Sequence, residues 1–102
     1  MEKMSLPVAC SLTEAELQER RTSVLQKLRP SVVEVKELSE GYAYHFPADD
    51  ALIAELAQLV SLERRCCPFL RFSITVEPGD GPVWLEMSGP QGTKDFLASV
   101  FN

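Results

Sequence analysis

Residues 70–88, LRFSITVEPGDGPVWLEMS, decide the fold. Apolar residues alternate with polar ones on both sides of residues 78–82, which supply the glycines and prolines of a turn. Alternation with a period of two is typical of a strand that buries one face, and two such strands joined by a glycine-bearing loop indicate an antiparallel hairpin. Residues 31–38 and 42–46, separated by a short segment ending in Gly41, predict a second hairpin.

Helical patterns separate and flank these hairpins. They predict a helix at residues 13–28 that starts with a capping box at Thr13. They also predict a helix capped by Asp49 or Asp50 that ends at about Cys66, and a last helix capped by Thr93 that ends at about Phe101. The order α-ββ-α-ββ-α predicts an α+β domain, with a four-stranded antiparallel sheet and helices mainly on one face. A sheet of this width, under about 20 Å, accommodates two packed helices, so the third is expected to be displaced. We expect a single domain over residues 1–102, with residues 1–11 as an N-terminal arm.

Composition and charge exclude several classes of protein. Ten Lys and Arg against fifteen Asp and Glu give 102 residues a net charge of −5, which argues against direct nucleic-acid binding. We expect neither a signal peptide nor a membrane segment, because no apolar run approaches the roughly 18 residues of a span. Three cysteines, two of them adjacent, form a poor disulfide framework. A reducing, cytoplasmic location is therefore predicted.

The segment 61–70, SLERRCCPFL, carries the candidate chemistry. Glu63 falls on the predicted buried stripe of the second helix, and Cys66 and Cys67 follow it at spacings of three and four. Because Pro68 unwinds the helix end, both sulfurs could face one ion. Thiolates favour copper(I), zinc and mercury-like ions. Glu63, Cys66 and Cys67 are therefore candidate metal ligands, and Cys10 could add a third sulfur if the N-terminal arm folds over this junction.

Other interpretations of the cysteines remain open. Buried cysteine usually packs as a small hydrophobe, and the chain has no C-x-x-C pair of zinc-site spacing. A thiol redox protein is a further alternative. A helix C-terminus disfavours a thiolate, so nucleophilic catalysis is not expected and the protein is not predicted to be an enzyme. Arg21, which occupies a slot in the apolar stripe of the first helix, is expected to extend its charged head into water.

A second candidate surface is the sheet face away from the helices. Strand parity assigns Trp84, Phe69 and Arg71 to this face, together with His45, the only histidine. An uncovered face with aromatic residues often marks a contact with a partner, so a homodimer is a further expectation. The alternative function is thus a non-catalytic interaction or dimerisation domain whose cysteines are structural.

The chain also resembles a small bacterial family. The similar segments are Cys10-Ser-Leu-Thr, Glu19-Arg-Arg, GYAYHFP at 41–47, ERRCCPFL at 63–70 and GPQGTK at 89–94. Members of this family occur alone or as a C-terminal extension of MerR-family heavy-metal-responsive regulators. The resemblance implies a cytoplasmic domain that handles or senses thiophilic metals, with Cys66, Cys67, Glu63 and Cys10 at the positions matching the family's motif. The leading hypothesis is therefore binding of a thiophilic ion in a heavy-metal response.

Overall fold

A computed structural model describes residues 14–102, and it has the predicted order of elements. The helices and strands are α1 (Ala15–Leu28), a 3-10 turn η1 (Arg29–Ser31), β1 (Glu34–Glu37), β2 (Gly41–Phe46), α2 (Asp50–Cys66), β3 (Arg71–Val76), β4 (Val83–Ser88) and α3 (Thr93–Val100). These elements confirm the α+β class and the α-ββ-α-ββ-α order. No helix within residues 14–102 is long and apolar enough to cross a membrane.

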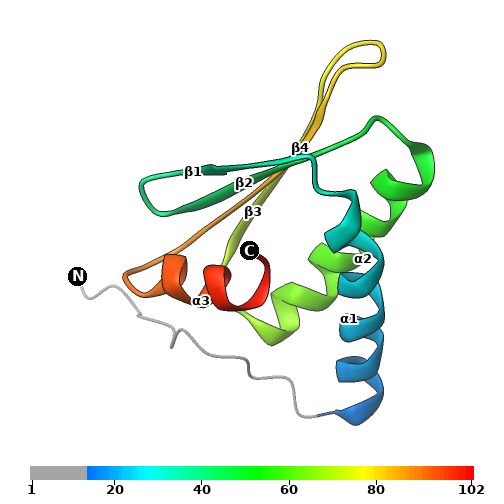
Figure 1. The fold of residues 1–102 in the computed structure, drawn as a ribbon. Helices are drawn as coiled ribbons and strands as arrows, with labels where there is room; N and C mark the ends of the chain where they lie inside the picture. The colour runs from blue at the N-terminus through cyan, green and yellow to red at the C-terminus, as the bar shows by residue number, and fades with distance from the viewer. Residues whose placement is uncertain (1–13) are drawn as a thin grey trace.

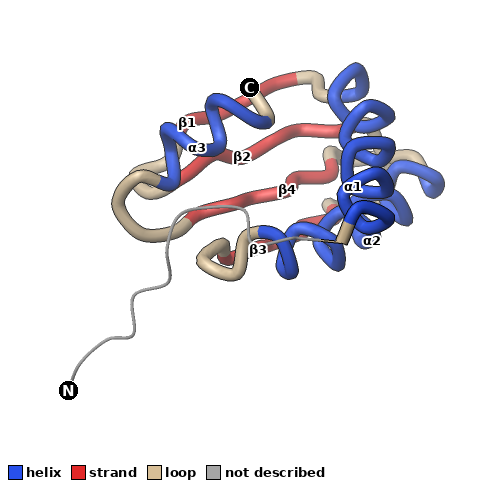
Figure 2. Tube along the Cα trace, turned by 90° about the horizontal axis from the view of Figure 1, so that it is seen from below, coloured by secondary structure: helices blue, strands red, loops and turns tan. Residues whose placement is uncertain are grey.

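The four strands form one antiparallel sheet in the order β1-β2-β4-β3. The two hairpins meet through β2 and β4, which pair from Gly41 opposite Ser88 to Phe46 opposite Val83. Helices α1, α2 and α3 all lie on the same side of this sheet (Figures 1 and 2). The third helix is therefore not displaced from that side: α1 packs against α2, and α3 takes the place over β2.

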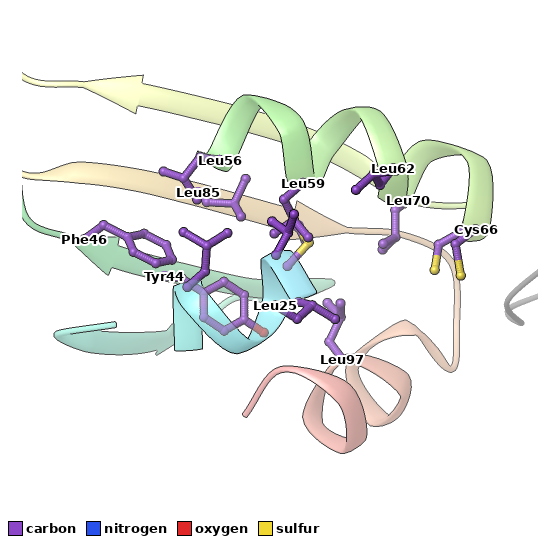
Figure 3. Packing of buried hydrophobic residues seen from close by; sticks show 14 of the residues in the cluster. Leu25, Tyr44, Phe46, Leu56, Leu59, Leu62, Cys66, Leu70, Leu85 and Leu97 are labelled. Atoms are coloured by element: carbon purple, nitrogen blue, oxygen red, sulfur yellow. The ribbon is translucent and has the colours of Figure 1, made fainter. Parts of the chain in front are cut away.

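The core lies between the sheet and the helices. Along β4 every second residue is buried, which is the alternation that the sequence predicted for a one-sided strand. The largest fully buried apolar side chains of α2, β4 and α3 are Leu56, Leu59, Leu85, Met87 and Leu97. Figure 3 shows Leu56, Leu59, Leu85 and Leu97 in one cluster with side chains of β2 and α1. Tyr44 lies in this core, with its hydroxyl 2.7 Å from Oδ1 of Asn102.

Some element boundaries differ from the prediction. The first strand is shorter, because Ser31 belongs to η1 and β1 begins only at Glu34. The expected cap of the last helix, Thr93, is instead its first residue, and Gly92 takes the N-cap position with a φ of 97° that favours glycine. The predicted capping box at Thr13 lies outside the described residues. Asp49 does cap α2, since its Oδ1 accepts a hydrogen bond from the Leu52 N–H at 3.0 Å.

Candidate metal centre

The candidate centre lies where α2 ends and the chain turns towards β3. The Cys67 N–H donates to the Glu63 carbonyl at 2.6 Å, closing the last turn of the helix. Cys67 itself leaves the helical conformation, with φ −124° and ψ 73°, as expected for a residue that precedes a proline. Helical spacing therefore sets the position of the Cys66 sulfur relative to the Glu63 carboxylate, and the proline sets that of the Cys67 sulfur.

Three potential ligand atoms converge at this junction. A carboxylate oxygen of Glu63 and the Sγ atoms of Cys66 and Cys67 all lie within 4.8 Å of one another. All three side chains are fully buried, so the group is an internal cluster rather than a chance grouping on the surface. The structure thus brings together three of the four predicted ligands. Cys10, the fourth, lies outside the described residues.

Arg21 of α1 is a member of this cluster that the sequence interpretation placed in water. Its Nε donates to Oε1 of Glu63, and its second guanidinium contact, from an Nη to Oε2, is 3.4 Å long. The Arg21 side chain is 16% exposed, whereas that of Glu63 is 0% exposed. The expectation for Arg21 was therefore wrong. Its charge compensates a buried carboxylate, which would otherwise carry a large desolvation cost.

The Cys67 thiol is held in its protonated form. It lies 3.4 Å from Oε2 of Glu63, to which it donates a hydrogen bond. Burial, with the negative charge and hydrogen bond of Glu63 acting in the same direction, raises the pKa of Cys67 from 9.0 to about 12, against the opposing charge of Arg21. Cys67 is consequently a poor nucleophile near neutral pH.

The two neighbouring cysteines differ in covalent state. Cys67 is a free thiol, whereas Cys66 is disulfide-bonded. A disulfide at Cys66 departs from the expectation that the cysteines would not form one. Since thiolates are the sulfur ligands that bind metals tightly, Cys66 can serve as such a ligand only after reduction.

The raised pKa of Cys67 predicts a loss of stability at alkaline pH. Between about pH 9 and pH 12 the unfolded chain loses the thiol proton while the native protein keeps it, so the free energy of unfolding must fall as pH rises. We expect a slope of roughly 1 kcal/mol per pH unit from this group. Urea unfolding from pH 8 to pH 10 measures it. Cys67→Ser should flatten the slope over this interval, and parallel slopes for the two proteins would contradict the prediction.

The residues of the predicted interaction face divide between two environments. Trp84 and His45 lie on the side of the sheet away from the helices, stacked at 4.9 Å, and the Lys36 ammonium lies 4.8 Å from the centre of the Trp84 ring. Arg71, at the start of β3, is exposed and shares this face. Phe69 does not: it is buried in the core, edge-on to Phe96 at 5.3 Å. Its predicted placement was wrong because the strand begins only at Arg71, so strand parity cannot be extended to residue 69.

Comparison with protein-family models, curated proteins and solved structures finds no match for this chain.

Proposed function

We propose that the domain, with its cysteines reduced, binds one thiophilic metal ion through Cys66, Cys67 and Glu63. The observation that carries this proposal is the convergence of two sulfurs and a carboxylate oxygen within 4.8 Å in a fully buried cluster. Sulfur ligands favour soft or borderline ions such as copper(I), zinc and mercury(II). The resemblance to the domains that accompany MerR-family regulators supports a role in a heavy-metal response.

Binding of an ion requires three changes in the cluster. The disulfide at Cys66 must be reduced, which a cytoplasmic location would favour. The Cys67 proton must leave, because the thiolate is the ligand. Glu63, which accepts hydrogen bonds from Arg21 and Cys67, must share or release them if its carboxylate is to contact the ion. Zinc or mercury(II) would then neutralise the charge of −2 that two thiolates provide, whereas copper(I) would leave one negative charge in the cluster.

The metal titration uses the full chain, reduced and kept anaerobic. Copper(I), zinc and mercury(II) are added in separate experiments against a competing chelator, and thiolate-to-metal charge-transfer absorption is recorded for copper(I) and mercury(II). We expect one tight site in the wild-type protein. Cys66→Ser and Cys67→Ser should each weaken binding at least tenfold, which corresponds to about 1.4 kcal/mol.

Two further variants assign the remaining ligands. Glu63→Gln keeps the shape of the side chain and removes its charge, so weaker binding in this variant would support carboxylate coordination. Cys10→Ser tests the predicted third sulfur. Equal, weak binding by the wild-type protein and by a Cys66→Ser/Cys67→Ser double variant would refute the proposed function.

A further inference from the structure

The free edge of β3 differs from the other edge of the sheet. Within residues 14–102, β3 pairs only with β4, and β1 pairs only with β2, so these two strands form the edges. β1 has four residues, three of them charged, and charged, short strands discourage pairing with another chain. β3 has six residues, RFSITV, with no proline and no charge after Arg71. On it Ile74 and Val76 are 36% and 53% exposed.

The hydrogen bond at the end of the β3–β4 hairpin shows which backbone groups of β3 point outward. The Glu77 N–H donates to the Pro82 carbonyl at 3.1 Å, so Glu77 is directed towards β4. In an antiparallel ladder, residues directed towards one neighbour alternate with residues directed away from it. Phe72, Ile74 and Val76 therefore direct their N–H and C=O groups to the free edge. The same three residues carry the apolar side chains of the strand.

We propose that a second copy of this chain pairs with β3 through its own β3, antiparallel, with Ile74 of each copy opposite Ile74 of the other. This register also places Phe72 opposite Val76 of the second copy. All of these are residues whose backbone groups point outward, so the pairing forms about six hydrogen bonds between the chains. The two sheets become one eight-stranded sheet, with the helices of both copies on the same side. This inference does not depend on metal binding.

Charge complementarity selects both the second copy and the register. With Ile74 opposite Ile74, Arg71 of each chain faces Glu77 of the other, and both side chains are exposed in a single copy. A register shifted by two residues would place Arg71 opposite Thr75 or Gly79, and both ion pairs would be lost. Opposite charges that face each other across paired strands stabilise the pair.

The ends of the proposed pairing are also self-complementary. In this register Leu70 of one copy is opposite Pro78 of the other. The Leu70 N–H already donates to the Cys67 carbonyl at 3.0 Å, and proline has no N–H to donate. Neither residue can therefore extend the ladder by donating an N–H, so the pairing ends where the donors end.

Sedimentation equilibrium of the full chain, from low micromolar to millimolar concentration, tests this proposal. We expect a monomer–dimer equilibrium in the wild-type protein. Arg71→Glu and Glu77→Arg should each weaken the dimer about tenfold, because each places like charges opposite one another at two symmetric positions. The double variant Arg71→Glu/Glu77→Arg should restore the wild-type affinity. Glu34→Arg, a matched charge reversal on the opposite edge at β1, should change nothing.

A further variant tests the centre of the pairing, with circular dichroism as the check that each protein is folded. Ile74→Lys places two ammonium groups opposite one another and should abolish the dimer. A monomer at every concentration would overturn the proposal. So would a dimer that Ile74→Lys leaves intact, or a charge-swapped double variant that remains as weak as the single variants.

Discussion

A Gly41→Ala variant is expected to lose about 4 kcal/mol of stability or more, and to be largely unfolded if the wild-type protein is marginally stable. Gly41 begins β2 and lies opposite Ser88 in the central pair of the sheet. A methyl group there would overlap the Met87 carbonyl oxygen and lie 2.7 Å from the Ser88 Cα and 2.8 Å from the Met87 carbonyl carbon. These are backbone atoms of a paired strand, so the clash cannot be relieved by rotating a side chain. The β2–β4 ladder, which joins the two hairpins, would have to separate.

Gly79→Ala is the matched control for this variant. Gly79 lies in the turn between β3 and β4 with a φ of 65°. Apart from Gly79 and its two chain neighbours, no heavy atom of the described residues lies within 4 Å of the position that its Cβ would take. Gly79→Ala is therefore expected to lose only about 1 kcal/mol of stability, because alanine disfavours a positive φ. Urea unfolding of the two variants and the wild-type protein measures the difference. Similar small losses for both would show that the β2–β4 pair adapts to a methyl group at Gly41, contrary to the prediction.

The strands were predictable because the alternation of apolar and polar residues that indicates a strand lies within the strand itself. The alternation along residues 83–88 shows which side chains are buried, and the order of the sheet brings the two hairpins together through β2 and β4. The start of β1 was not predictable, since Val32 and Val33 have high strand propensity but follow the η1 turn. The position of α3 over β2, on the same side of the sheet as the packed pair α1 and α2, was not predicted either. Packing between helices is a tertiary property, which hydrophobic periodicity does not specify.

The candidate site was predictable to the extent that it lies on one helix. Glu63, Cys66 and Cys67 share a turn of α2, so helical spacing alone indicated that they converge. Arg21 reaches the same site from α1, 42 residues earlier, and this pairing is not encoded in spacing. The sequence nevertheless contained an indication of this ion pair. Arg21 and Glu63 each occupy a position in the apolar stripe of their helix where a hydrophobic residue is expected. Two opposite charges on two buried stripes are a reason to predict an ion pair between the helices.

An Arg21→Ala variant is expected to lose about 3 kcal/mol of stability, because it leaves the fully buried Glu63 carboxylate without a counter-charge. The value is set at the lower end of the range for buried pairs, since Arg21 is 16% exposed and partly solvated. Replacing both partners, as Arg21→Leu/Glu63→Leu, should cost far less than Arg21→Ala alone. Thermal and urea unfolding of these variants measure the losses. A double variant as unstable as Arg21→Ala would contradict this account.

The same pair connects stability to the proposed metal binding. In the wild-type protein Arg21 and a metal ion compete for the charge of Glu63, whereas in Arg21→Ala the ion would be the main source of positive charge in the cluster. Under reducing conditions a thiophilic ion should therefore raise the melting temperature of Arg21→Ala by more than that of the wild-type protein. Arg20→Ala, which removes an exposed arginine of the same helix, is the control and should respond as the wild-type protein does. If Glu63 is not a ligand and senses no charge from the ion, all three proteins will show the same increase.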